Sequence, residues 1–281
     1  MKENFDTFIT AKKNPFKLNI KEAAKYKDLI WLLVQRNFKA KYKQTVLGPL
    51  WFVIQPLLTT FVFTIVFGQI AKLSTDGTPQ FLFYLAGSVP WLYFASVINQ
   101  TSNTFYSNAR LFSRVYFPRI IAPISTAITC FFNFLIEFLM FIVIDVIFIL
   151  SGANVEMTLY ALLSPLLILQ LGILGMSVGV IISSLTVKYR DLQVLVGFGV
   201  QLWMYLSPVV YSAAAIENET LKTLLMLNPV SPIIEFLRKG FINAGSTPWL
   251  YLAISFGLTM VLAFLSLIIF NKTERNFIDK I

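Results

Sequence analysis

The amino-acid sequence predicts an all-α integral membrane protein with six transmembrane helices, an amphipathic interface helix before the first of them, and a re-entrant outer hairpin between helices 5 and 6. Three observations support this fold class. Apolar residues make up 57% of the 281 residues, against roughly 45–50% in soluble domains. Charged residues make up only 13%, about half of the roughly 25% usual in soluble proteins. These charges are crowded into a few segments, between which lie apolar runs long enough to cross a bilayer.

The amino-terminal part of the chain is basic and precedes the first apolar run. Residues 1–19 are polar and predict a cytosolic arm, with no apolar core and cleavage site of a signal peptide. Residues 20–45 have helical spacing and predict a basic amphipathic helix, of the kind that lies in the membrane interface. Packing on a protein partner is the alternative. The apolar face of this helix consists of Tyr26, Ile30, Leu33, Val34 and Phe38.

Residues 46–281 form the predicted transmembrane domain. A span needs about 20 apolar residues to cross roughly 30 Å of hydrocarbon, and six runs qualify. They cover residues 50–71, 81–99, 120–150, 158–187, 192–211 and 249–270. With six crossings both termini lie in the cytosol, and nineteen of the 23 Lys and Arg residues then fall in cytosolic loops, as the positive-inside rule requires. Those loops are residues 1–45, 110–119, 188–190 and 272–280.

The segment of residues 216–244 does not fit a span. Its two short apolar pieces are separated by Asn228-Pro229 and Ser231-Pro232, and each is too short to cross. Irregular backbone at membrane depth is tolerated only where protein or a water-filled cavity covers it. We therefore predict a re-entrant helical hairpin on the outer side, with an ordinary outer loop of two surface helices as the alternative.

Motifs for catalysis and cofactor binding are missing from the sequence. It has no His, and Cys130 is its only cysteine, which removes the commonest general base and any disulfide or thiolate metal cluster within one chain. It also has no GxxxxGK[ST] phosphate loop. The net charge of +9 is divided among loops, whereas nucleic-acid binding needs a continuous basic face. The sequence therefore shows no recognisable catalytic set, and it predicts no metal site, cofactor or nucleic-acid partner for this chain.

Two acids, Glu137 and Asp145, lie well inside the third predicted span. Charged residues in a span usually face the bundle interior or a cavity. Asn133 lies one turn before Glu137 and extends a local polar face. A structural role, a helix contact and a place on a transport path are all compatible with this pattern, and Asp145 is near enough to the outer end to reach the headgroups.

Two basic segments are predicted to face the cytosol. Residues 108–119, NARLFSRVYFPR, place three arginines among aromatic and apolar side chains, so a short amphipathic element can present a basic face. Residues 188–191, KYRD, join the fourth and fifth spans. Taken alone, such loops are typical of contact with lipid headgroups.

Several stretches share their order and spacing with one known family. They are YKQTVLGPLWFVIQP at 42–56, VFG at 66–68, Pro90-Trp91, residues 108–119, KYRDL at 188–192, QLWMYLSPVVY at 201–211, and Asn228-Pro229 with Arg238. Each stretch is a weak signal alone, but together they span most of residues 26–270. In this combination the chain resembles the membrane subunits of ABC-2 type polysaccharide exporters, and most closely those that export lipid-linked O-antigen.

The resemblance implies partners and a substrate. Two copies of the chain pair to form a channel in the cytoplasmic (inner) membrane, and two copies of a separate ABC ATPase, which hold ATP and Mg, dock on the cytosolic side. The substrate is a polysaccharide linked to undecaprenyl pyrophosphate. Because the ATPase is a separate polypeptide, the resemblance also explains why this chain lacks a phosphate loop.

The resemblance also implies three groups of site residues. The element that couples to the ATPase contains Arg110, Phe112, Arg114, Tyr116, Arg119, Tyr189 and Arg190. The entrance for the lipid carrier, where cations meet pyrophosphate and membrane lipid, contains Arg36, Lys39, Lys41, Tyr42 and Lys43. The re-entrant exit element contains Asn228, Pro229, Glu235 and Arg238.

A path for a polysaccharide should be broad and lined by aromatic rings, because sugars present apolar C–H faces that stack on such rings. The candidates for these rings are Trp91, Tyr93, Phe94, Trp203 and Tyr205.

Other functions stay open at this stage. Within the ABC class they are export of teichoic acid, capsule, or a drug or lipid. A membrane transferase acting on a polyprenyl substrate needs acids near the cytosolic interface, where only Asp28 and Asp191 lie and no DxD or HxxxxD pattern occurs. A secondary transporter needs sites near the bilayer midplane, for which Glu137 alone is a thin basis.

Overall fold

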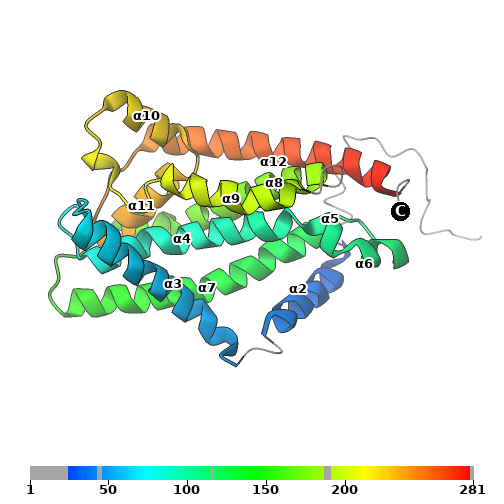
Figure 1. Ribbon diagram of the computed structural model, residues 1–281, viewed down its shortest axis with the longest axis horizontal. Coiled ribbons are helices and arrows are strands. Elements are labelled where there is room, and N and C mark those ends of the chain that lie inside the picture. Colours follow the sequence, from blue (N-terminus) through cyan, green and yellow to red (C-terminus); the bar gives the residue numbers. More distant parts are fainter. Residues whose placement is uncertain (1–24, 43–45, 116, 187–190, 279–281) are drawn as a thin grey trace, which may run out of the picture.

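The computed structural model describes residues 25–42, 46–115, 117–186 and 191–278, and within these ranges it is all-helical, with the long helices side by side (Figure 1). The α-helices are α2 (Lys27–Tyr42), α3 (Trp51–Phe63), α4 (Gln80–Thr101), α5 (Thr104–Ser107), α6 (Ala109–Arg114), α7 (Ile121–Leu150), α8 (Ser164–Thr186), α9 (Leu192–Tyr205), α10 (Glu219–Leu227), α11 (Ser231–Ile242) and α12 (Trp249–Ile278). Short 3-10 helices are η1 (Gly48–Leu50), η3 (Leu159–Leu163) and η4 (Ala213–Ala215), and η2 (Thr64–Ile70) is a π-helix that continues α3.

Five helical segments of the described chain are long and apolar enough to cross a membrane, and they match five of the six predicted spans. They are Gly48–Ile70, Gln80–Thr101, Ile121–Leu150, Leu159–Thr186 and Trp249–Glu274. The remaining predicted span, residues 192–211, is helical only over the 14 residues of α9. At 1.5 Å per residue this helix covers about 21 Å, which is less than the roughly 30 Å of hydrocarbon.

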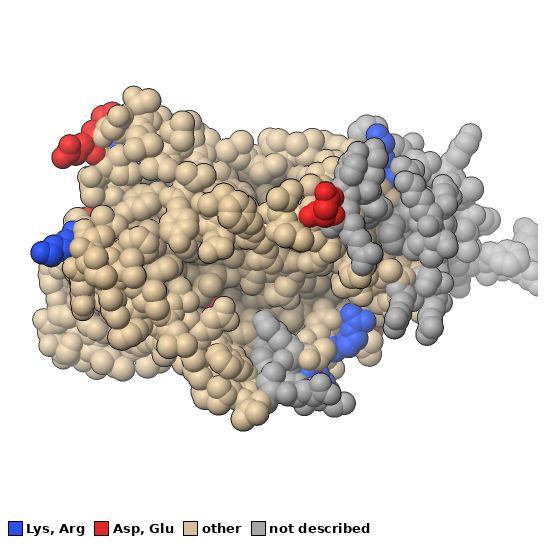
Figure 2. Space-filling view, in the orientation of Figure 1, with Lys and Arg blue, Asp and Glu red and all other residues tan. Residues whose placement is uncertain are grey.

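The surface agrees with this arrangement. On the face drawn in Figure 2, the exposed charged side chains lie toward the two ends of the molecule, and the broad outer surface between them is uncharged. The end that carries α2, α5 and α6 is called the inner end here, and the end that carries α10 and α11 the outer end (Figure 1).

Helix α4 forms the centre of the main core. Its residues from Leu82 to Pro90 are all buried, and it packs against α3, α7, α8 and α11. Glycines on α8 allow close packing on α4: a Cβ atom at Gly175 would lie 3.2 Å from the Val97 side chain and 3.3 Å from the Phe94 ring. Small residues at a helix interface are the usual means by which membrane helices approach one another.

Gly240 on α11 marks an even closer approach, against the backbone of η3. A Cβ atom at Gly240 would lie 2.9 Å from both the N and Cα atoms of Ala161, and the Gly240 carbonyl accepts a hydrogen bond from the Thr158 amide at 2.8 Å. Because backbone atoms cannot rotate away, we expect Gly240→Ala to lower the free energy of unfolding by about 1–3 kcal/mol, the usual cost of overpacking. Thermal unfolding of the purified full chain measures this effect.

The matched control is Gly257→Ala on α12, where nothing lies within 4 Å of the added Cβ atom. This variant should be as stable as the unmodified chain or slightly more so, because Ala favours a helix over Gly by about 1 kcal/mol. Equal melting temperatures for the two variants would contradict the close contact between α11 and η3.

A second, smaller core lies at the inner end. It joins α2, α5 and α6 to the inner ends of α7, α8 and α12, and its buried members are Leu33, Phe105, Phe112, Phe117, Ile121, Ala122, Val180 and Phe270. On α2, Leu33 and Val34 of the predicted apolar face are 2% and 3% exposed, and the helix packs against α7. Trp31 and Leu32 stay 52% and 60% exposed, so α2 has a second apolar surface beyond the one it buries.

Candidate functional site

The chain after α9 is irregular although it is buried at the outer end. Helix α9 ends at Tyr205, and Ser207, Val209 and Val210 are 0%, 0% and 3% exposed. Buried backbone N–H and C=O groups outside regular structure need partners from elsewhere in the protein. In this segment two side chains from the α10–α11 hairpin donate to the carbonyls of Leu206, Val209 and Tyr211.

Asn228, at the turn between α10 and α11, is the first of these side chains. Its Nδ2 donates to the Leu206 carbonyl at 2.9 Å and to Ser207 Oγ at 2.8 Å. Its Oδ1 accepts from Trp203 Nε1 at 3.1 Å and from the Val230 amide at 3.2 Å. All the donors and acceptors of the amide are thereby used. Asn228 ties the end of α9 to the start of α11.

The next residue, Pro229, ties the same turn to two long helices. Its carbonyl accepts from Ser255 Oγ of α12 at 2.5 Å, and that hydroxyl accepts from Gln170 Nε2 of α8 at 2.8 Å. Gln170 and Ser255 are 3% and 1% exposed. The Asn228-Pro229 pair is therefore anchored on both sides of the hairpin.

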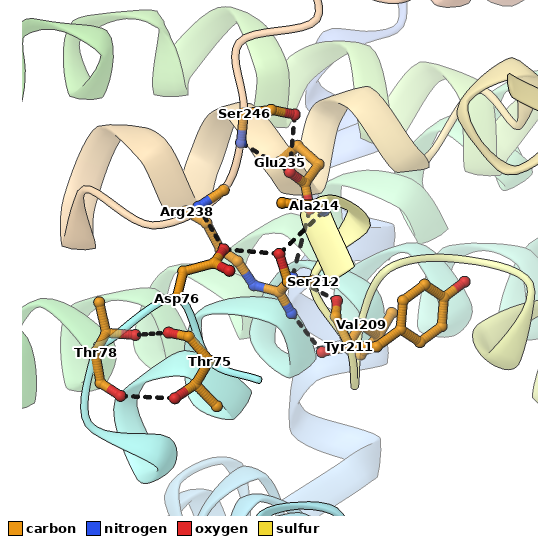
Figure 3. A network of polar contacts seen from close by, with 11 residues as sticks. Thr75, Asp76, Thr78, Val209, Tyr211, Ser212, Ala214, Glu235, Arg238 and Ser246 are labelled. Atoms are coloured by element: carbon orange, nitrogen blue, oxygen red, sulfur yellow. Dashed lines mark hydrogen bonds and ion pairs between the residues drawn. The ribbon is translucent and has the colours of Figure 1, made fainter. Parts of the chain in front are cut away.

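Arg238 of α11 is the second side chain that donates hydrogen bonds to backbone carbonyls of the irregular segment (Figure 3). It is 0% exposed, and its Nη1 donates to the Tyr211 carbonyl at 3.2 Å while Nη2 donates to the Val209 carbonyl. Its guanidinium carbon lies 3.9 Å from the centre of the Phe83 ring of α4. One buried cation thus holds the chain after α9 against α4.

Two acids surround this cation and connect three loops. Glu235 Oε1 lies 3.7 Å from Arg238 Nη1, and Glu235 Oε2 accepts from the Ser246 amide at 2.9 Å. Asp76 Oδ2 accepts from Ser212 Oγ at 2.7 Å and from the Gly245 amide at 3.1 Å (Figure 3). Burial lowers the pKa of Arg238 to about 10, and Glu235 and Asp76 counteract this shift. Arg238 is therefore protonated at neutral pH.

We call Asp76, Asn228, Glu235 and Arg238 the outer clamp. Three of these residues are among those predicted from the sequence, and Asp76 is not. The available signal was a short polar loop, residues 72–78, that contains an acid and Gly77. Asp76 has a φ of 54°, a conformation that Asp and Asn adopt more readily than most residues.

At the inner end, one predicted coupling residue, Phe112, belongs to the second core, and another, Arg119, packs against its ring. Phe112 is 7% exposed and its ring centre lies 5.8 Å from that of Phe117. Arg119 has its guanidinium carbon 5.5 Å from the Phe112 ring centre, and its Nη1 donates to the Glu274 carbonyl of α12 at 3.1 Å. These two residues attach the α5–α6 element to the bundle. Of the other predicted coupling residues, Tyr116, Tyr189 and Arg190 lie outside the described residues, as do the side chains of Arg110 and Arg114.

The residues predicted for the lipid-carrier entrance lie on α2. Arg36 Nη2 donates to Asn108 Oδ1 at 3.3 Å, so this cation joins α2 to the turn between α5 and α6. Lys39 is exposed at the edge of an apolar groove of about 530 Å³ between α2 and α7. Lys43 and the side chains of Lys41 and Tyr42 lie outside the described part of the chain.

The five aromatic rings predicted for a channel do not share one surface. Trp91, Tyr93 and Phe94 are 3%, 4% and 0% exposed because α4 is covered by its neighbours. Trp203 of α9 is half-buried, with its ring centre 5.2 Å from that of Phe94. Tyr205 is 46% exposed. Tyr205 belongs to an exposed apolar face of α9, whose other members are Val194, Leu195, Phe198 and Leu202.

The two acids of α7 have different surroundings. Asp145 is 0% exposed rather than at the headgroups, and neither carboxylate oxygen has a hydrogen-bond partner among the described residues. Glu137 is half-buried and lines a small polar cavity together with Asn133. In the part of the chain that the structure describes, no group of His, Cys, Asp and Glu is suited to a metal ion.

Five long apolar helices, a basic helical element at the inner end and a buried polar clamp at the outer end define a polytopic integral membrane protein. The chain belongs to the ABC-2 type transporter family, whose sequence profile matches residues 28–242. The matched region contains all of α2 except Lys27 and the whole of α3 to α11, and therefore the outer clamp.

Individual relatives are similar over most of their length. The chain is 28% identical to the "O-antigen export system permease protein RfbA" of Klebsiella pneumoniae over 252 residues, which are 90% of this chain and 94% of the relative. It is 27% identical to a protein of the same name from Myxococcus xanthus, over 75% of this chain and 79% of the relative. It is 25% identical to the "Polysialic acid transport protein KpsM" of Escherichia coli, over 86% of this chain and 92% of the relative.

Proposed function

We propose that this chain is the membrane-spanning subunit of an ATP-driven exporter, which moves polyprenyl-pyrophosphate-linked polysaccharide of the O-antigen type across the cytoplasmic membrane. The observation that carries this proposal is the similarity to O-antigen export permeases over 90% of the chain. The sequence contains no phosphate loop, so ATP and Mg belong to a separate ABC ATPase. In this proposal the chain is a transport subunit and has no enzyme activity by itself.

The proposed assembly contains two copies of this chain and two ATPase subunits. Helix α9 and the buried segment up to Tyr211 together make the sixth crossing, which puts both termini in the cytosol. Helices α10 and α11 form the re-entrant hairpin on the outer side. The burial of α11 supports this assignment, because every residue from Ser231 to Arg238 is buried, whereas a surface helix would expose one face.

The α5–α6 element is the proposed docking site for the ATPase. Phe112 and Arg119 hold it in the second core, and Arg110, Arg114, Tyr116, Tyr189 and Arg190 are proposed to contact the partner. A docking element has to be attached firmly to the transmembrane helices if it is to move them. The ring contacts of Phe112 and the bond from Arg119 to α12 provide such an attachment.

The carrier lipid is proposed to enter beside α2, as the position of this helix suggests. Arg36 and Lys39 are exposed cations that can meet a pyrophosphate, and the groove between α2 and α7 offers an apolar surface for an isoprenoid chain. Lys41, Tyr42 and Lys43 extend the same basic stretch in sequence. The exposed face of α9, with Tyr205 at its outer end, is proposed to face the channel and the second copy of the chain.

A test of this function combines purification and gene deletion in the natural host. An affinity-tagged chain should co-purify with an ATPase that carries a phosphate loop. Deletion of this chain should reduce polysaccharide at the cell surface at least tenfold, while lipid-linked polymer accumulates at the cytosolic face of the membrane, and the unmodified gene should restore export. Unchanged surface polysaccharide after the deletion, or transport by the chain alone without nucleotide, would contradict the proposal.

Export of a capsule-type polymer is the second candidate function, and the similarity to a polysialic acid transport protein favours it. The same deletion distinguishes the two candidates. The accumulating polymer would carry a polyprenyl pyrophosphate in the first case and would be an acidic polymer of the polysialic acid kind in the second.

A further inference from the structure

A polar cavity lies inside the bundle between α3, α4 and α7. Its volume is about 170 Å³, which is below the roughly 300–1,000 Å³ of sites for drug-sized ligands. The polar side chains that line it include Gln55 of α3, Ser96 of α4, and Asn133 and Glu137 of α7. In the space-filling view, a recess lies between α3 and the body of the bundle (Figure 2). A cavity of this polarity needs a polar occupant.

Asn133 shows that the protein alone does not provide a hydrogen-bond partner for every polar group that lines the cavity. Its side chain is 5% exposed, and its Oδ1 has no hydrogen-bond partner among the described residues. Leaving a buried acceptor unpaired is costly, and more so in a low-dielectric membrane interior. Asn228, by comparison, uses both ends of its amide. The Asn133 carbonyl oxygen therefore has room for a donor that comes from outside the chain.

The lining restricts which donor this can be. Asn133 Oδ1 and the Glu137 carboxylate are acceptors, which suit hydroxyl or amide N–H groups. None of the described lining residues is Lys or Arg, so the cavity does not select phosphate. Its single carboxylate is also a poor basis for a divalent cation. The rings of Trp51 and Tyr93 add apolar surface beside the polar groups, as recognition of a sugar requires.

We propose that this cavity binds a single sugar ring of the glycolipid substrate. A hydroxyl or acetamide donor of the ring pairs with Asn133 Oδ1, Gln55 bonds a second edge of the ring, and the C–H face of the ring lies against the aromatic side chains. The volume admits one ring and excludes a chain of sugars. The cavity is formed by the first turns of α3, at Trp51 and Gln55, and so lies on the side of the bundle where α2 precedes α3 (Figure 1). The proposal rests on the proposed export of polysaccharide.

Direct binding to the full chain in lipid nanodiscs tests the site. The probes are radiolabelled octyl β-N-acetylglucosaminide and octyl β-galactoside, which carry one sugar ring to membrane depth, and binding is measured by scintillation proximity. We expect saturable binding of at least one probe to the unmodified chain. Asn133→Leu should weaken it at least tenfold, and Gln55→Met, on another helix, at least threefold.

The matched control is Thr126→Val on α7, which lies outside the cavity lining and whose hydroxyl bonds only the Ala122 carbonyl of its own helix among the contacts described. It should keep the affinity within twofold. If Asn133→Leu fails to fold, the Gln55→Met variant tests the site instead. Gln55 is exposed and bonds no described group that folding requires, so this variant should stay folded. Absence of saturable binding of both probes, or unchanged affinity in Gln55→Met, would overturn the site.

The binding assay contains no ATPase and no polymer, so its outcome is independent of the export test. If the chain shows saturable binding but its deletion leaves surface polysaccharide unchanged, the sugar site is supported and the proposed function is contradicted. If deletion abolishes surface polysaccharide but neither probe binds, the proposed function is supported and the sugar site is contradicted.

Discussion

Replacing Arg238 with Met is expected to lower the free energy of unfolding by about 3–5 kcal/mol, the usual cost of removing one partner of a buried ion pair. The substitution leaves the Val209 and Tyr211 carbonyls without their donor and leaves Glu235, which is 0% exposed, without its cation. At about 2–4 °C per kcal/mol, the melting temperature of the purified chain should fall by at least about 6 °C. Export should be lost with it, because the segment after α9 is no longer held against α4.

Two controls separate this effect from a general effect of removing a cation. Lys239→Met removes the neighbouring positive charge, which is only half-buried, and should change the melting temperature by less than about 2 °C, since surface charges contribute little. The double variant Glu235→Gln with Arg238→Met should be more stable than Arg238→Met alone, because the buried carboxylate is no longer uncompensated. A double variant as unstable as the sum of both single variants would contradict direct coupling within the outer clamp.

Replacing Arg114 and Tyr116 together with Ala is expected to reduce export at least tenfold while ATP hydrolysis continues and the protein stays folded in the membrane. Both residues belong to the proposed contact with the ATPase. The measurement compares polysaccharide at the cell surface with ATPase activity of the purified complex. Substrate should no longer stimulate this activity in the variant.

Phe112→Ala is the contrasting variant of the same element. Its ring is buried in the second core, and truncating a buried Phe costs about 3–5 kcal/mol, so this variant should lose stability as well as export. If the double variant at Arg114 and Tyr116 keeps substrate-stimulated ATPase activity, the assignment of these residues to the coupling site is wrong.

The sequence was sufficient to predict the long helices, because a span is defined by the length of an apolar run. Residues 81–99 and 120–150 were predicted as spans, and α4 and α7 begin and end within two residues of these bounds. It was not sufficient for α9. The run of residues 192–211 is mostly apolar. Its hydrophobicity does not reveal that the helix stops at Tyr205, nor that side chains distant in sequence bond the backbone beyond it.

Some of the candidate site residues could likewise be predicted from the sequence and others could not. Asn228, Glu235 and Arg238 were selected from a resemblance, and the structure brings them together around one segment. The aromatic candidates on α4 were chosen by residue type, which cannot tell a ring that lines a path from one that fills a core. Asp76 was missed because its partners, Ser212 and Gly245, are 136 and 169 residues away in sequence.

Helix α12 connects the two ends of the molecule mechanically. Its 30 residues make a rod about 45 Å long at 1.5 Å per residue. At one end Trp249 lies 4.8 Å from the Phe236 ring of α11, and at the other Phe270 stacks on Phe105 at 5.0 Å. A hydrogen-bonded rod hardly changes length under load. An axial displacement of the α5–α6 element would therefore be transmitted along α12 to the hairpin that carries Arg238.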